Sequence, residues 1–488
     1  MPRLSHPSAE ALRSGALATA AMLSLGACAV GPDYHSPSPA VPDSFVSVEG
    51  SRLSAADVER DFWKSFSDPQ LDALIEQALS SNHDIRIAID RLREARALRG
   101  EARLDLAPAV TAEAGHSESR ASERQAAPVA AAGRAQSYYD VGFDAFWELD
   151  FFGRVRRGLE AHSAKLQSAE AAVYATQVSI TAEVARNYFE LRGAQQRLEV
   201  ARRNAGNQRE TLNITDARLD AGRGTQLDTS RARAQLSATL ATIPDLQASV
   251  TRSILRLGVL VGKQPDALFG ELSAPRELPP LPETHRIGTP ELLLRRRPDI
   301  RVAERDLAAA TAQIGIAVAD LFPRISFVGH WGYDALDRSD LGDAASESYV
   351  FGPSIRWAAF DLGRVRRRIE QREAAADRAL ARYEQTVLRA LEETDSSLTS
   401  YMKAMVKQQH LQTSAAASLE AAMLARARYE NGVADFLTVL DAERSALEAE
   451  DRLAQSETQT ATALLAMYKA LGGGFRPLDA RTLSVARQ

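Results

Sequence analysis

The chain contains a single cysteine, Cys28, close to its start. A thiol can act as a nucleophile, a metal ligand, a disulfide partner or an acceptor of a lipid. A metal site is not indicated, because the 8 histidines are scattered without an HExxH motif or another paired spacing. No serine lies in a nucleophile elbow of the GxSxG type. These absences argue against an enzyme and leave lipid attachment as the chemistry to examine for Cys28.

The residues before Cys28 match the export signal of a bacterial lipoprotein. Gly15–Ala27 is an apolar segment that is too short to span a bilayer as a mature helix. Its end, Leu25-Gly26-Ala27-Cys28, resembles a lipobox, where the chain is cut before a cysteine that carries diacylglycerol. The sequence therefore predicts a signal peptide over residues 1–27 and a lipid on Cys28. The alternatives are an ordinary signal peptide with a chance cysteine and an N-terminal membrane anchor.

The residues after Cys28 favour the outer membrane and a lipid-anchored tether. Ala29 occupies the position at which aspartate usually retains a lipoprotein at the inner membrane. Residues 28–60 are expected to form the tether, since Ser36–Ser54 is rich in proline. With a lipid on Cys28 the mature chain has no free thiol, which suits an oxidising compartment.

Length and composition exclude several classes of protein. At 488 residues the chain is too long for one ordinary core. A net charge of −5, with 25% charged residues, gives no sign of a nucleic-acid partner. After the signal there is no run of about 18 apolar residues, so only β-strands could cross a membrane.

Several short blocks of sequence occur twice in the same order, which indicates an internal duplication. Asn82–Ala97 resembles Arg297–Ala312, and Asp150–Arg157 resembles Asp361–Arg367. The predicted divisions are a signal peptide (1–27), a tether (28–60), a first repeat (61–272), a linker (273–289), a second repeat (290–474) and a tail (475–488).

Each repeat contains two stretches in which apolar and polar residues alternate. Tyr139–Leu149, Arg324–Asp334 and Ser348–Trp357 alternate strictly, and Ala109–His116 does so more weakly, with residues 117–135 expected to form a loop. Their length and the aromatic residues near their ends are typical of membrane strands, although a soluble sandwich would give the same alternation. Four strands cannot close a barrel, and open edges are not tolerated in lipid, so membrane strands would require an oligomer.

Two long proline-free spans follow the strands and predict helical hairpins. They run from Gly153 to Ile243 and from Ser354 to Arg476, with apolar residues at coiled-coil spacing. Gly222–Gly224 and Asn431–Gly432 interrupt them and are expected to form the turns. Each arm of about 60 residues would be roughly 90 Å long.

Several motifs together resemble those of a known family. They are the lipobox with the following Ala29–Tyr34, and Phe62–Leu79, Arg296–Glu304 and Leu437–Ser445. The chain is similar to the TolC-like outer membrane factors, and within them to the efflux outer membrane lipoproteins of the NodT type. The resemblance implies an α+β membrane protein, a homotrimer with a twelve-stranded transmembrane β-barrel, four strands per chain, continued by a long periplasmic α-helical barrel.

The resemblance also implies a function. Such channels carry small molecules, including drugs and toxic compounds, from an inner-membrane pump, usually of the resistance-nodulation-division class, through a periplasmic adaptor. The implied location is the outer membrane of a Gram-negative bacterium, with a covalent lipid on Cys28 and no other cofactor. The alternative is a lipid-anchored periplasmic coiled-coil scaffold without channel activity, whose strands form a soluble sandwich.

The family's functional residues lie at the periplasmic end of the hairpins. The resemblance places a pore gate at Leu437 and Asp441, which share one helix face, and three copies of Asp441 would form an acidic ring. Alternatively, Asp441 pairs with Arg444 or with a neighbouring helical arm, and Leu437 packs in a coiled coil. The resemblance places adaptor contacts at the hairpin tips, or alternatively these residues only shape the turns: Arg218, Leu219, Gly222, Leu227, Tyr429, Gly432, Val433 and Phe436.

A repeated GRVRR segment marks the step from strand to helix. Gly153 and Gly363 are expected to form these turns. The arginines of the two segments would then lie near the membrane surface, beside phosphates or acidic residues: Arg154, Arg156, Arg364 and Arg366.

Overall fold

The structure is a computed structural model that describes residues 29–46, 53–54, 60–122, 124, 135–282 and 285–477. The predicted signal peptide and the lipid-acceptor Cys28 lie outside the described residues. The chain divides into two compact units, each drawing on both halves of the sequence. Unit 1 combines Met1–Ser38, Leu92–Ala169 and Val302–Tyr383, and unit 2 combines Pro39–Arg91, Glu170–Arg301 and Glu384–Gln488.

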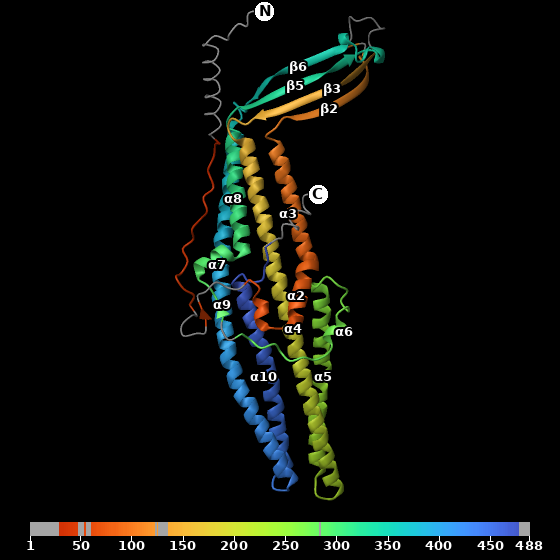
Figure 1. Cartoon of the computed structure of the whole chain (residues 1–488), viewed down its shortest axis with the longest axis vertical. Helices are drawn as coiled ribbons and strands as arrows, with labels where there is room; N and C mark the ends of the chain where they lie inside the picture. Colours follow the sequence, from red (N-terminus) through yellow and green to blue (C-terminus); the bar gives the residue numbers. More distant parts are fainter. Residues whose placement is uncertain are drawn as a thin grey trace, which may run out of the picture. The chain divides into compact units, whose positions relative to one another are not determined.

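Unit 1 contains one antiparallel sheet of four strands (Figure 1). The strands lie in the order β2 (Ala109–Arg120), β3 (Ala135–Leu149), β5 (Arg324–Ala335) and β6 (Glu347–Arg356). All four predicted strands are present, but the expected loop over residues 117–135 was too long. Ser117 to Arg120 pair with Tyr138 to Ala135, because the backbone ladder continues where the side chains no longer alternate.

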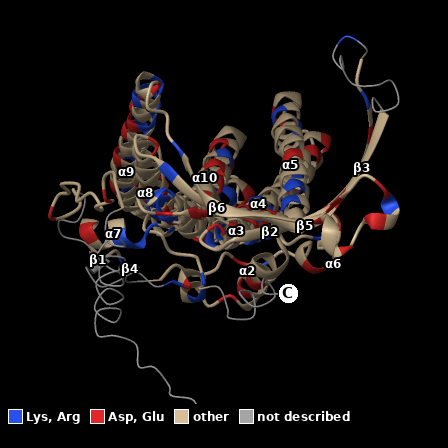
Figure 2. Ribbon diagram, turned by 90° about the horizontal axis from the view of Figure 1, so that it is seen from above, with Lys and Arg blue, Asp and Glu red and all other residues tan. Residues whose placement is uncertain are grey.

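The strand register gathers the apolar residues on one face of the sheet. Phe143 lies opposite Trp331, and Trp331 lies opposite Tyr349. The other face is mixed. On it the ring Nδ1 of His330 lies 3.0 Å from a carboxylate oxygen of Asp144, but Phe146 lies opposite Val328 and is exposed. Figure 2 shows few charged residues along these strands. The large apolar side chains of the sheet are exposed. Each outer strand, β2 and β6, pairs with only one described neighbour. Another surface must therefore cover both the apolar face and the strand edges.

The long helices form two hairpins of unequal arms. The outgoing helices α4 (Arg154–Asp220) and α9 (Leu362–Glu430) have 67 and 69 residues, whereas the return helices α5 (Gln226–Leu260) and α10 (Phe436–Ala470) have 35 each. The prediction of about 60 residues per arm is therefore wrong for the return arms. Gly262 and Gly472 stop them, because their left-handed φ angles of 72° and 72° end a helix.

The two halves of the chain use the same order of elements. A helix leads into each strand pair: α3 (His83–Leu104) precedes β2, and α8 (Pro298–Ala319) precedes β5. The indole of Trp147 donates to the carbonyl of Leu106 at 3.1 Å, and that of Trp357 donates to Leu321 at 3.0 Å. The boundaries of the two repeats remain a prediction.

The two GRVRR segments are not equivalent. Gly153 has a left-handed φ of 81° just before α4, whereas Gly363 lies inside the first turn of α9, so only Gly153 forms the expected turn. Arg154 donates through Nε to Glu148 at 2.7 Å, while the side chain of Arg364 is largely exposed.

Unit 2 has the main apolar core, where short elements pack around the hairpin helices. Trp63, Tyr188, Leu257, Tyr401 and Leu464 are fully buried in it. The short elements of unit 2 are η1 (Phe62–Phe66), α2 (Pro69–Ser81), α6 (Phe269–Leu272), α7 (Pro290–Arg296), β1 (Leu53–Ser54) and β4 (His285–Arg286). The short helices η3 (Arg338–Asp340) and η4 (Ala344–Ser346) belong to unit 1, between β5 and β6.

The described residues contain neither a membrane-spanning helix nor a cluster that could hold a metal ion. None of their helices has a stretch that is long and apolar enough to cross a membrane. No group of three or more His, Cys, Asp or Glu residues in this part of the chain is arranged to hold a metal ion.

Candidate functional site at the hairpin turns

The two hairpin turns, both in unit 2, have the same backbone geometry. Gly222 and Gly432 adopt left-handed φ angles of 69° and 73°. In the first turn the N–H of Gly222 donates to the carbonyl of Leu219 at 2.9 Å, and the N–H of Arg223 donates to that of Arg218 at 2.8 Å. The second turn repeats both bonds. Glycine is required because a Cβ disfavours this conformation.

A polar side chain caps the return helix after each turn. Thr225 accepts the N–H of Asp228 at 3.2 Å before α5. Asp435 accepts the N–H of Thr438 at 2.9 Å and its hydroxyl at 2.6 Å before α10. These bonds lower the pKa of Asp435, so its carboxylate stays ionised beside the positive end of the helix.

Two of the predicted adaptor contacts are buried inside the hairpin ends. Tyr429 and Phe436 are 6% and 4% exposed, with ring centroids 5.8 Å apart, and they pack with Val439 and Ala232. Their burial favours the alternative in which these two residues shape the hairpin ends, and their contact with an adaptor remains a prediction. Large rings close to a turn are buried here because they join the second hairpin to α5 of the first.

The other predicted tip residues are accessible to a partner. Val433 is 66% exposed and Leu227 is 57% exposed, which leaves apolar side chains in solvent beside the turns. The remaining four are wholly or partly exposed: Arg218, Leu219, Gly222 and Gly432.

Arg218 joins the end of α4 to the end of α9. Its Nη2 donates to the carbonyl of Tyr429 at 2.7 Å. The guanidinium carbon lies 4.0 Å from the centroid of the Tyr429 ring, within the range of a cation–π contact. Arg218 thus holds the two hairpins together as well as presenting a partly exposed surface.

A second arginine, Arg426, connects three helices near the turns. Its Nη2 donates to Glu443 at 2.8 Å, to the hydroxyl of Thr211 at 2.9 Å and to the carbonyl of Asn207 at 3.0 Å. The hydroxyl of Thr211 donates to the same Glu443 oxygen at 2.9 Å. The Glu443 side chain is only 11% exposed, so this charged cluster is mostly shielded from water. Sequence reasoning missed it, because no motif marks the three helices as neighbours.

The proposed gate residues lie on one exposed face of α10. The Asp441 side chain is 58% exposed, and Leu437 is also exposed. Arg444 approaches Asp441 at 3.5 Å, an exposed contact between residues three apart on the helix that contributes little. Asp441 is therefore available to solvent or to a neighbouring chain, and its role as a gate remains a prediction.

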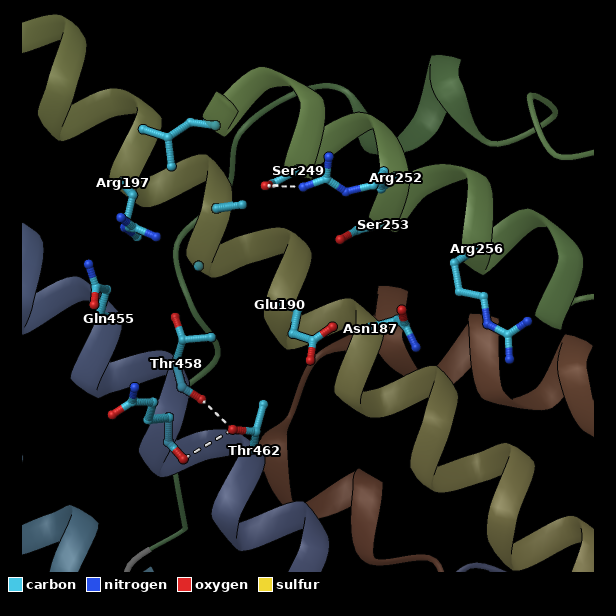
Figure 3. Close-up of a pocket in the computed structure, with 14 residues that line it drawn as sticks. Asn187, Glu190, Arg197, Ser249, Arg252, Ser253, Arg256, Gln455, Thr458 and Thr462 are labelled. Carbon is cyan, nitrogen blue, oxygen red and sulfur yellow. Dashed lines mark hydrogen bonds between the residues drawn. The ribbon is translucent and has the colours of Figure 1, made fainter. Parts of the chain in front are cut away.

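A polar cavity of about 630 Å³ lies among α4, α5 and α10, away from the turns (Figure 3). Arg197, Arg252 and Arg256 line it together with serine, threonine and glutamine side chains. The helices α4 and α10 touch beside it through Gly193, where a Cβ would lie 2.0 Å from the hydroxyl oxygen of Thr458. The close approach of these two helices therefore requires glycine at position 193.

Known proteins resemble the chain over almost its whole length. A sequence model of the family described as "Outer membrane efflux protein" matches residues 74–263 and 289–473. The chain is 34% identical to outer membrane protein OprJ of Pseudomonas aeruginosa, over 95% of this chain and 96% of OprJ. It is 31% identical to the toluene efflux pump outer membrane protein TtgI of Pseudomonas putida, over 93% of this chain and 97% of TtgI. The solved structure of the outer-membrane channel OprN superimposes with a TM-score of 0.86 at 44% identity, covering 92% of this chain and 100% of that one.

Proposed function

The chain belongs to the outer membrane efflux protein family, and from this premise we propose that it is the outer membrane channel of a tripartite efflux system. It conducts drugs and other small toxic compounds from an inner-membrane pump and a periplasmic adaptor out of the cell. The observation that carries this proposal is the sheet of unit 1. One of its faces is strongly apolar, and the other carries most of its charged side chains. Among the described residues, the outer edges of β2 and β6 have no pairing strand. Lipid on one side and water on the other would satisfy both faces.

Closure of the sheet requires several copies of the chain. Within the described chain, the outer edges of β2 and β6 have unpaired backbone groups, which lipid does not tolerate. Three copies pool twelve strands, enough for a water-filled barrel, and their helical hairpins continue the duct into the periplasm. The resemblance to the TolC-like factors supports the homotrimer.

The hairpin turns supply the gate and the docking surface of this duct. Leu437 and Asp441 of three chains form the narrowest ring, where the carboxylates favour cations. The adaptor contacts the exposed residues of the tips, with Val433 and Leu227 as its apolar anchors. The partners are therefore two further copies of the chain, the adaptor, and a pump of the resistance-nodulation-division class.

A lipid on Cys28 provides a second attachment to the outer membrane. The lipobox supports this modification, and no other cofactor is proposed. In the proposed channel, both the membrane strands and the lipid attach the protein to the outer membrane. A lipid-anchored scaffold would be attached by its lipid alone.

A Cys28→Ser variant, exported with an ordinary cleavable signal, tests the channel against the scaffold. We expect the variant to remain in outer-membrane fractions after a carbonate wash and to migrate as a trimer after chemical cross-linking. The strands hold it there without a lipid. The acylated wild type is the control. Recovery of folded, monomeric variant in the periplasmic fraction would favour the scaffold.

A further inference from the structure

The segment that follows Cys28 is held against the body of unit 1. We propose that Ala29–Tyr34 is an intramolecular ligand seated in a groove between α4 and α8. The sequence alone indicates only a lipid-anchored tether over this region. The docking does not depend on the proposed lipid attachment.

Arg157 of α4 supplies the polar contacts of the groove. Its Nη2 donates to the Asp33 carboxylate at 2.7 Å and to the carbonyl of Gly31 at 3.3 Å, and its Nε donates to the carbonyl of Val30 at 3.3 Å. The N–H of Val30 donates to the carbonyl of Phe152 at 3.1 Å. The Arg157 side chain is only 4% exposed. A buried guanidinium needs such partners, and the N-terminal segment supplies three of them.

Glycines allow the segment to approach the body so closely. A Cβ on Gly31 would lie 2.5 Å from the Cα of Gly315 in α8, and a Cβ on Gly315 would lie 2.8 Å from the Cδ of Arg157. A Cβ on Gly153 would lie 2.6 Å from the Cβ of Ala29. Gly31 also has a left-handed φ of 91°. The groove therefore fits this backbone only where both surfaces carry glycine.

Tyr34 fixes the other end of the segment to α8. Its hydroxyl donates to Glu304 at 2.6 Å, and the guanidinium carbon of Arg305 lies 5.4 Å from its ring centroid. Burial raises the pKa of Tyr34 to about 12, and the bond to Glu304 adds to this effect. The hydroxyl therefore stays protonated and donates to the carboxylate at every physiological pH.

Cleavage by chymotrypsin after Tyr34 tests the docking on the purified full-length mature protein in detergent. We expect slow cleavage in the wild type and in Ser38→Ala, an exposed change in the same segment. Gly31→Ala, which introduces the steric conflict, and Tyr34→Phe, which keeps the cleavage site but loses the bond to Glu304, should be cut about tenfold faster or more. Intact-protein mass spectrometry reports the released peptide. Unchanged circular dichroism would show that both variants remain folded.

A Cys28→Ser form of each protein separates the groove from the lipid. The groove predicts the same order of cleavage rates with and without the lipid. Equal rates in wild type, Gly31→Ala and Tyr34→Phe would overturn the proposal. So would a Cys28→Ser chain that is cut as fast as Gly31→Ala, since the lipid alone would then hold the segment. Cleavage is independent of channel activity, so failure of the proposed function would leave this result unchanged.

Discussion

Replacement of Arg426 by methionine is expected to open the periplasmic end of the channel. The substitution removes the guanidinium that joins α4, α9 and α10 and leaves Glu443 shielded without its charged partner. An unpaired carboxylate of this kind costs about 2–4 kcal/mol, which shifts the two hairpins towards arrangements in which they separate. Cells that depend on this channel should become at least tenfold more susceptible to vancomycin, which an intact outer membrane excludes.

Arg452→Met is the matched control for this prediction. Arg452 also lies on a hairpin helix, but its side chain is exposed and contacts only Glu448 of its own helix, at 3.3 Å. Such a surface pair contributes less than about 1 kcal/mol, so susceptibility should not change. Vancomycin susceptibility that stays at the wild-type value in Arg426→Met, with normal amounts of trimer in the membrane, would contradict a role for this cluster in closing the duct.

Replacement of Arg297 by methionine is expected to destabilise unit 2. Arg297 donates to the carbonyl of Ala470, the last residue of α10, at 2.9 Å. Its Nη2 donates to Asp299 at 2.7 Å and to Glu393 of α9 at 2.8 Å. Removal of one partner from a fully buried ion pair costs about 3–5 kcal/mol, and the half-exposed carboxylates lower this to about 2–4 kcal/mol. The apparent Tm should fall by roughly 5–10 °C.

Arg295→Met provides the comparison for Arg297. Arg295 lies two residues earlier, is exposed, and pairs only with exposed Glu291 at 2.8 Å. Its loss should shift the apparent Tm by no more than about 2 °C. Thermal unfolding followed by circular dichroism at one scan rate measures both variants. Equal shifts for the two arginines would show that the buried cluster at Arg297 does not stabilise the helix ends.

Much of the fold could be predicted from the sequence, because two periodicities dominate it. Alternation over Tyr139–Leu149 and Arg324–Asp334 identified central strands, and the absence of proline identified the long helices. The lengths of the return helices were missed. Gly262 and Gly472 end them, but a glycine in a helical pattern does not reveal by itself whether it ends the helix.

The candidate site was harder to predict, because its contacts join residues that are distant in sequence. Tyr429 and Phe436 flank a turn, and only the packing of the second hairpin on α5 decides that they are buried. Arg426 finds Glu443 and Thr211 through the register of three helices. No spacing within one helix encodes that register.

The docking of the N-terminal segment was also not predictable from the sequence, because it too joins residues that are distant in sequence. Proline-rich sequence after Cys28 indicates a tether, because extended residues without periodicity carry no sign of a partner. The structure instead places Val30 against Phe152 and Tyr34 against Glu304. A short segment that binds through glycines and backbone carbonyls leaves little trace in a pattern of hydrophobicity.

The most direct test of the account is the single-channel conductance of the purified protein in a planar bilayer, with wild type beside Asp441→Ala. A duct that ends in a ring of Asp441 predicts small, cation-selective openings in the wild type. In the variant the openings should become larger or lose their selectivity, because the acidic ring is gone. Conductance that is identical in the two proteins would keep the channel and remove Asp441 from its gate. The absence of any conductance from folded, trimeric protein of either kind would contradict the channel itself.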